Sequence, residues 1–390
     1  MCRDATRLET AFDAELWASQ LLGMWSPPGF GADADDGERE VGAVFVEELE
    51  QIGGDGALSA LTAIGNVSGT ELGRLALERA RRLVAAGATP PAWEHAIRQA
   101  QIPRALVVRD EVFDDGITVW LEARHEGEEP RALGVYIDHN LGVMAKDILV
   151  ADSLEEVERI LREAHADEDP VELIFEPMDV REAGARIRAA MDFTDMTLDP
   201  PVSDDYVSLR ALALLLADEI PLTEIDPLHE LDADERDRLF SDFLASPEAS
   251  GLAPESDEAD AAATAIDFCA DYVDGRPLRW SPVVVELFMT GWLPSKVVAE
   301  RAYFEAVPAG LEAWVRYAGR RRGIPAWAIE RTVTAIARSR DEMLEHAASG
   351  GRRGIAADFF AAARDAGVDL SDESALAGFV AGWNARSELA

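Results

Sequence analysis

The residues best suited to chemistry in this 390-residue chain stand close together in its first half. Asp138, His139 and Asn140 follow a run of alternating apolar and polar residues, and Lys146 and Asp147 come soon after. Carboxylate and imidazole groups at a strand end can ligate a metal or transfer protons. A hairpin here would bring Asp138 or His139 near Lys146 or Asp147. We therefore take Asp138, His139, Lys146 and Asp147 as the candidate catalytic residues.

A structural role competes with this interpretation and is favoured over it. Asp and Asn are common turn formers, and a histidine in a turn often bonds the backbone. The pattern of nucleases with two acids and a lysine is also incomplete, because Met144 stands where the acid two residues before Lys146 should be. If the chain is an enzyme, His139 and at least one of Asp138 and Asp147 should line a pocket within reach of each other.

Four arginines, Arg316, Arg320, Arg321 and Arg322, crowd the end of a predicted helix and form the candidate partner-binding surface. Arginines with interleaved tryptophans can hold phosphates and stack on bases. The favoured alternative is that they complement the helix dipole or dock on acidic residues of the same chain. Arg316 and Arg320 lie one helical turn apart, so we expect both to contact acidic residues, either of this chain or of a partner.

The charge of the chain is large and uneven. Acidic residues outnumber basic ones by 75 to 36, which gives a net charge of −39, and only two of the basic residues are lysines. The stretch 275–355 nevertheless holds 13 basic and 8 acidic residues, a local net of +5. This asymmetry favours a protein partner, while the overall charge repels nucleic acid and anionic membranes. A high-salt cytoplasm and a GC-rich genome would both explain the scarcity of lysine.

Strong catalytic and cofactor motifs are missing from the sequence. It has no Walker A loop, no GxGxxG after a strand, no HExxH and no GxSxG. Two cysteines, Cys2 and Cys269, are too few for a zinc knuckle or a disulfide framework. We therefore expect no cofactor and no metal. The remaining histidines are scattered and are expected to be surface or satisfied helix residues: His95, His125, His165, His229 and His346.

Targeting signals are also missing from the sequence. The first residues lack the continuous apolar segment of a signal peptide, and no apolar run reaches the roughly 18 residues of a membrane span. We therefore expect an intracellular, cytoplasmic protein without a membrane partner.

The period of the hydrophobic pattern changes twice along the chain, which predicts a multidomain α+β protein. Residues 1–102 indicate a helical N-terminal region, with a capping box from Ser68 to Glu71. Residues 103–200 indicate a small, mainly antiparallel sheet domain with two helices, at 154–164 and 180–191. Its strands are predicted at 106–113, 117–125, 132–138, 143–150 and 171–176.

Residues 201–390 indicate an all-α C-terminal domain without strands. Pro282, Pro308 and Pro325 stand where the first turn of a helix is expected. The predicted helices lie at 206–217, 233–245, 256–273, 281–291, 295–306, 308–322, 325–347, 354–366 and 372–387.

Three segments carry a resemblance to other proteins: 134–142 (GVYIDHNLG), 280–286 (WSPVVVE) and 317–325 (YAGRRRGIP). They resemble stretches of hypothetical proteins from GC-rich actinobacteria, a group without an established activity. The resemblance implies a bacterial cytoplasmic setting and transfers no catalytic residue.

These observations leave three hypotheses about function, and they do not decide whether the chain is an enzyme. The leading one is a non-enzymatic intracellular interaction or regulatory protein with an unidentified protein partner. The second is a hydrolase or metal-dependent enzyme that uses the region from Asp138 to Asp147. The third is a nucleic-acid-associated factor that uses the face from Arg316 to Arg322.

Overall fold

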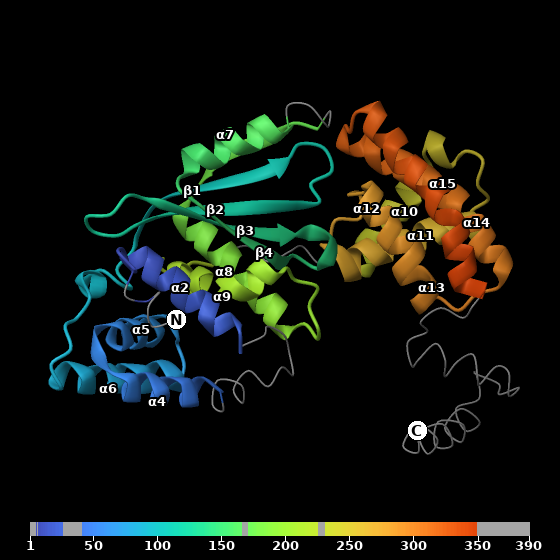
Figure 1. Cartoon of the computed structure of the whole chain (residues 1–390). Helices are drawn as coiled ribbons and strands as arrows, with labels where there is room; N and C mark the ends of the chain where they lie inside the picture. The colour runs from blue at the N-terminus through green and yellow to red at the C-terminus, as the bar shows by residue number, and fades with distance from the viewer. Residues whose placement is uncertain (1–4, 6, 26–40, 166–170, 225–230, 349–390) are drawn as a thin grey trace, which may run out of the picture. The chain divides into compact units, whose positions relative to one another are not determined.

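The computed structural model describes all residues except 1–4, 6, 26–40, 166–170, 225–230 and 349–390 (Figure 1). The chain forms two compact units, unit 1 over Met1–Pro227 and unit 2 over Leu228–Ala390. Unit 1 holds a sheet and helices, and the described part of unit 2 is helical, which confirms the predicted α+β class. The predicted helices at 354–366 and 372–387 lie outside the described residues.

One five-stranded antiparallel sheet organises unit 1, with strand order β4-β3-β2-β1-β5. All five strands were predicted to within about five residues at each end, and β2 and β3, where alternation was clearest in the sequence, are buried on both faces along most of their length. The strands are β1 (Gln101–Asp110), β2 (Gly116–Arg124), β3 (Arg131–Asp138), β4 (Met144–Ala151) and β5 (Leu173–Met178).

Helices cover both faces of this sheet (Figure 1). The side chains of Val119 and Leu121 belong to the main core, which α8 (Val180–Met196) helps to form. Trp120, between them in sequence, belongs to a smaller cluster with residues of α7 (Leu154–His165). Successive side chains of β2 therefore pack into two different apolar clusters, one on each face of the sheet.

The N-terminal helices share the main core of the sheet and do not build one of their own. That core runs from Ala5 to Ile220 in sequence. The predicted capping box from Ser68 to Glu71 does not form: Thr70 is the N-cap of α6 and accepts from the Leu72 backbone N–H, while Glu71 is the first helical residue and bonds Arg74. The elements are α2 (Ala11–Gly23), α4 (Ala43–Ile52), α5 (Gly54–Val67), α6 (Glu71–Ala85) and the short 3₁₀ helix η2 (Ala92–His95).

The boundary between the two units lies further along the chain than residue 200, where the sequence predicted it. Helix α9 (Asp204–Asp218) packs on α2 and β4 and buries Tyr206, Leu212 and Leu216 in the core of unit 1. Pro200 and Pro201 favour a linker over 197–206, but Ser203 donates its backbone N–H to the Lys146 carbonyl and fixes this segment against β4.

Unit 2 surrounds an aromatic core. Phe243, Trp314 and Tyr317 pack edge to face or tilted, with ring centroids 5.3–5.5 Å apart. The thiol of Cys269 is buried in the same core, and this burial raises its pKa. The elements are α10 (Ala233–Leu244), η4 (Pro247–Ala249), α11 (Asp257–Phe268), η5 (Cys269–Val273), α12 (Pro282–Glu286), η6 (Leu287–Trp292), α13 (Leu293–Lys296), α14 (Arg301–Arg322) and α15 (Ala326–Ala348).

Pro308 does not begin a helix, contrary to the prediction from sequence. It lies inside α14, which joins the two segments predicted at 295–306 and 308–322. A proline inside a helix removes one backbone hydrogen bond and must be compensated by packing. That packing is tight two residues later, because a Cβ on Gly310 would lie 2.0 Å from the Glu258 carbonyl oxygen of α11. Packing against α11 therefore keeps α14 helical on both sides of Pro308.

No helix among the described residues is both long and apolar enough to cross a membrane.

Candidate functional site

The turn between β3 and β4 carries Asp138, His139 and Asn140, as the sequence predicted. The Asp138 carboxylate accepts a hydrogen bond of 2.8 Å from the Asn140 backbone N–H and so caps the short 3₁₀ helix η3 (His139–Leu141). Gly142 and Val143 then both adopt left-handed backbone angles, with φ of 75° and 64°. This conformation is costly for the β-branched Val143, so the turn stores local strain.

A β-bulge positions Lys146. Tyr136 of β3 pairs with Asp147, but the next residue, Ile137, pairs with Ala145, so Lys146 is the extra residue of β4. The Lys146 Nζ lies 3.3 Å from the Asp138 Oδ2, which is the approach expected of a hairpin. The Lys146 side chain is 37% exposed, so this ion pair is well hydrated and contributes little to stability.

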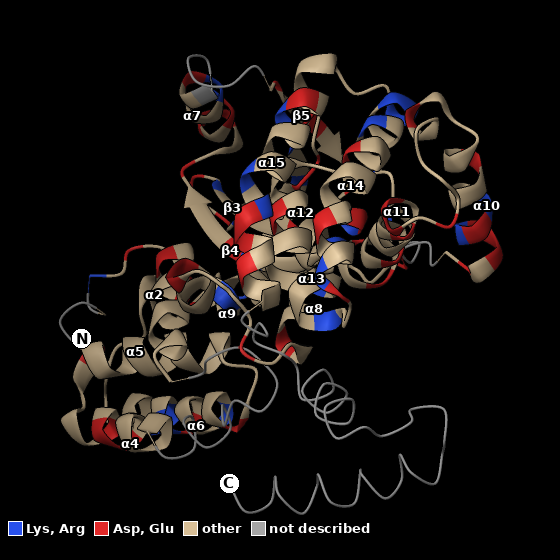
Figure 2. Ribbon diagram, turned by 90° about the vertical axis from the view of Figure 1, so that its right-hand side faces the viewer, with Lys and Arg blue, Asp and Glu red and all other residues tan. Residues whose placement is uncertain are grey.

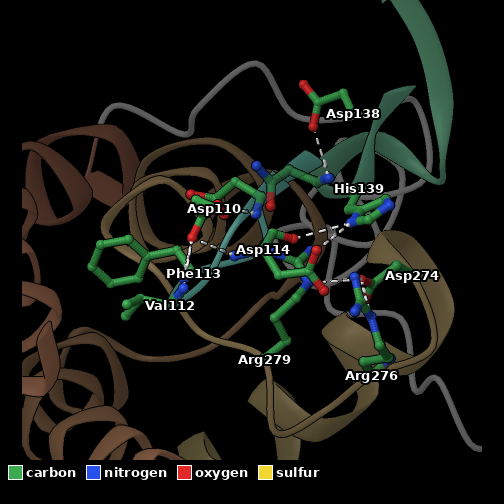
Figure 3. A network of polar contacts seen from close by, with 11 residues as sticks. Asp110, Val112, Phe113, Asp114, Asp138, His139, Asp274, Arg276 and Arg279 are labelled. Carbon is green, nitrogen blue, oxygen red and sulfur yellow. Dashed lines mark hydrogen bonds and ion pairs between the residues drawn. The ribbon is translucent and has the colours of Figure 1, made fainter. Parts of the chain in front are cut away.

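The other two candidates have different neighbours. His139 Nδ1 lies 3.0 Å from the Asp114 carbonyl and 3.4 Å from the Asp114 carboxylate (Figure 3). Asp114 is held there because Asp110 accepts the backbone N–H groups of the turn between β1 and β2. Asp147 accepts from the Ser203 hydroxyl, and it thereby joins β4 to the start of α9.

The four candidate residues thus fix three separate connections in unit 1. Asp138 and Lys146 close the hairpin, His139 contacts the neighbouring turn, and Asp147 holds the segment before α9. Within the described ranges, no group of three or more His, Cys, Asp or Glu residues could hold a metal ion. Each of these contacts is typical of residues that stabilise turns and connections, the structural role that the sequence favoured over catalysis.

Beside this turn, three apolar side chains at the end of α8 stand in solvent. Phe193, Met196 and Leu198 are 40%, 68% and 77% exposed. A Cβ on Gly142 would lie 2.7 Å from the Phe193 ring, so the aromatic ring rests directly on the strained turn. The Thr194 hydroxyl donates to the Ala145 carbonyl and fixes the end of α8 against β4. We call Phe193, Met196 and Leu198 the α8 trio.

Exposed aspartates flank the α8 trio in sequence. Asp192, Asp199, Asp204 and Asp205 are all exposed, and none of them forms an ion pair with another residue in the part of the chain that the structure describes. Asp195, by contrast, is held by Arg210 on the adjoining helix. The trio is therefore an apolar group in an acidic setting.

The arginine surface of α14 is engaged within unit 2. Arg316 bonds Glu312 and Glu330, and Arg320 makes two hydrogen bonds of 2.6 and 3.0 Å to Glu248. The Arg320 guanidinium lowers the pKa of Glu248 to about 2. Arg321 donates to the Tyr317 hydroxyl, and Arg322 lies in the last helical turn. In Figure 2, Lys and Arg lie along α14, Asp and Glu lie along α11, and residues of both charges lie along α10.

These contacts answer the expectation for Arg316 and Arg320, since both meet acidic residues of this chain. Whether the surface also binds a partner stays a prediction.

Unit 1 also contains a buried charged group around His125 that was not predicted from the sequence. His125, expected to be a surface or satisfied helix residue, is only 4% exposed and follows the end of β2. Its Nε2 lies 3.1 Å from Glu15 of α2, and its Nδ1 lies 3.8 Å from Glu128. Burial disfavours the imidazolium, but the hydrogen bond and charge of Glu15, together with Glu128, raise the pKa of His125 above its ordinary value.

Both carboxylates have further backbone partners. Glu15 also accepts the Arg98 backbone N–H at 2.8 Å, and Glu128 accepts the Ala11 N–H at the start of α2. The Glu15–His125–Glu128 cluster therefore ties α2 to the sheet. The local signals were a histidine at a strand end and Glu128 three residues later, but the other acid of the cluster, Glu15, is 110 residues away in sequence.

Compared with protein-family models, curated proteins and solved structures, the chain gives no match.

Proposed function

We propose that the chain is a non-enzymatic interaction protein that binds a basic protein partner through the α8 trio of unit 1. The observation that carries the proposal is the exposure of three neighbouring apolar side chains, Phe193, Met196 and Leu198, in an acidic surround. Exposed apolar groups rimmed by polar residues are typical of protein–protein interfaces. Aromatic side chains in such a group, here Phe193, are the usual anchors.

The charge of unit 1 favours a basic partner. This unit carries 19 basic and 47 acidic residues, a net charge of −28. Asp192 and Asp199 stand next to the trio in sequence without an ion pair among the described residues, so their charge is available to steer an approaching cation. A partner with an apolar side chain inside a ring of Lys and Arg would match this surface.

The strained turn beneath Phe193 adds support. Backbone strain such as that at Val143 tends to collect at binding and switching sites. The arginine surface of unit 2 supports a partner less well, since Arg316 and Arg320 already hold carboxylates of their own unit. Binding nucleic acid there would require those ion pairs to break, at a cost that the net charge of −39 increases.

The experiment is a matched pull-down from the native host with mass spectrometry. The bait pair is the wild type and the double variant Phe193→Ser with Met196→Ser, and Leu222→Ser, which is 81% exposed elsewhere in unit 1, is the control. We expect a basic protein that the wild type and the control retain, that the double variant loses, and that about 300 mM salt releases. Equal recovery by all three baits would contradict the proposal.

A further inference from the structure

A cleft of about 330 Å³ lies between α5, α6 and the segment around η2, far in sequence from the α8 trio. Its apolar walls come from Leu58 of α5, from Leu77 and Val84 of α6, and from Pro90. Leu77 and Val84 are two helical turns apart, so α6 presents one continuous apolar stripe to the cleft. A volume of this size suits a small organic molecule.

The cleft also contains a buried hydroxyl without a hydrogen bond. Thr62 lines the cleft, is 2% exposed, and its Oγ1 has no hydrogen-bond partner in the described structure. Other buried helical threonines avoid this: Thr194 and Thr332 donate to the carbonyl four residues earlier, at 2.9 and 3.0 Å. A buried polar group left unpaired is costly, so it calls for an explanation.

Polar groups of both charges complete the cleft. Asn66, one turn after Thr62, donates its Nδ2 to the Thr62 carbonyl and keeps its Oδ1 as an acceptor. Arg81 and Glu94 line the cleft and are exposed, and neither side chain forms a hydrogen bond or ion pair with another described residue. By contrast, Arg79 and Arg82, on the same helix as Arg81, both hold Glu50.

We propose that this α5–α6 cleft binds a small zwitterion with an apolar body, of the class of apolar α-amino acids. The ligand carboxylate pairs with Arg81 and its ammonium group pairs with Glu94. The apolar body lies over Leu58, Leu77 and Val84, and the Thr62 hydroxyl, which is enclosed in the unliganded structure, turns to donate to a ligand oxygen. A ligand with a carboxylate alone would place a second negative charge beside Glu94 and give Glu94 no cationic partner. A zwitterion gives both Arg81 and Glu94 a partner of opposite charge.

Isothermal titration calorimetry on the full chain tests this, with L-phenylalanine and L-leucine as probes. Phenylacetate and phenethylamine, which each lack one of the two charges, are the matched analogues. We expect an amino acid to bind and both analogues to bind at least about tenfold more weakly. No heat from either amino acid up to about 10 mM, or phenylacetate binding as well as phenylalanine, would overturn the proposal.

Three variants locate the site. Arg81→Gln, Glu94→Gln and Thr62→Val should each weaken amino-acid binding about tenfold, while Arg74→Gln, on the same helix but paired with Glu71, should leave it unchanged. Thr62→Val is nearly isosteric and removes an unpaired hydroxyl, so its melting temperature should not fall. Binding that Arg81→Gln and Glu94→Gln both leave intact would place the ligand elsewhere and refute the cleft.

Discussion

Two charged clusters of the molecule lie at different depths, the His125 cluster of unit 1 and the arginine surface of α14 in unit 2, although unit 2 also buries an ion pair between Arg279 and Asp274. In unit 1, His125 stands between Glu15 and Glu128 in the core, with the His125 and Glu15 side chains 1% and 0% exposed. In unit 2, Arg316 and Arg320 hold their carboxylates at the surface, with side chains 35% and 51% exposed. Water screens the second group and not the first, so equal numbers of ion pairs should have unequal weight in stability.

The largest effect should follow from breaking the buried cluster. His125→Leu leaves Glu15 as a buried carboxylate without its cation, which should cost about 3 kcal/mol or more of the stability of unit 1. The measurement is hydrogen exchange of α2 peptides in the full chain, followed by mass spectrometry. Unchanged protection of α2 would show that the cluster does not hold this helix to the sheet.

The same cluster should respond to pH. Because the folded-state pKa of His125 is raised, the stabilisation from its imidazolium is fully present below the unfolded pKa and is lost as pH rises through the folded pKa. The advantage of wild type over His125→Gln, read as α2 protection, should therefore be larger near pH 6 than near pH 9. The carboxylates that face this imidazole are Glu15 and Glu128, and the Glu219 charge also favours its protonation. An advantage that grows with pH would mean that the histidine is neutral when folded.

Reversing a surface arginine should have a moderate effect. Arg316→Glu places a third carboxylate beside Glu312 and Glu330, so we expect the melting temperature of unit 2 to fall with a loss of about 1 to 2 kcal/mol. Added salt should reduce this loss by screening the repulsion. A variant as stable as wild type at low salt would show that surface pairing contributes nothing here.

The pair of Arg320 and Glu248 should contribute less, and only above acid pH. Arg320→Gln should lower stability near neutral pH by less than Arg316→Glu does, because Arg320 is half exposed and its pairing with Glu248 is screened by water. The lowered pKa of Glu248, about 2, means that this contribution is present above the ordinary glutamate range and is lost as pH falls through about 2. Urea unfolding at pH 7 and pH 2.5 would measure it, and a constant difference would exclude the pair as its source.

The smallest effect on stability should come from the α8 trio. Met196→Ser removes a side chain that is largely in water and Phe193→Ser removes one that is 40% exposed, so the free energy of unfolding should change by only about 1 kcal/mol. Thermal unfolding of the double variant beside Leu222→Ser is the check. A large loss would mean that the trio supports the strained turn more than it serves a partner.

Local sequence patterns predicted most of the helices and strands, but features that depend on long-range packing could not be predicted. Strands β2 and β3 followed from alternation in the sequence, whereas the cap of α6 was predicted two residues too early, at Ser68 instead of Thr70. The continuity of α14 through Pro308 could not be predicted, because it depends on contact with Glu258, fifty residues earlier. The position of α9 in unit 1 depends likewise on its packing against α2 and β4.

The candidate site residues also fall into those with local partners, which could be predicted, and those with distant partners, which could not. Hairpin geometry brought Asp138 to Lys146, and the helical spacing of Arg316 and Arg320 predicted their acidic contacts. The partners of His139 and Asp147 belong to other segments and carried no local signal. The cluster of Glu15, His125 and Glu128 was missed because an isolated histidine reveals nothing about burial until the chain is folded.

The close approach at Gly310 limits how unit 2 can be divided. Only a residue without a side chain fits against the Glu258 carbonyl. This contact therefore allows α11 and α14 a single relative register. Two fragments cut between these helices would each expose half of that contact. They would be expected to reassemble with each other in one alignment, which makes this interval a suitable position for a split reporter.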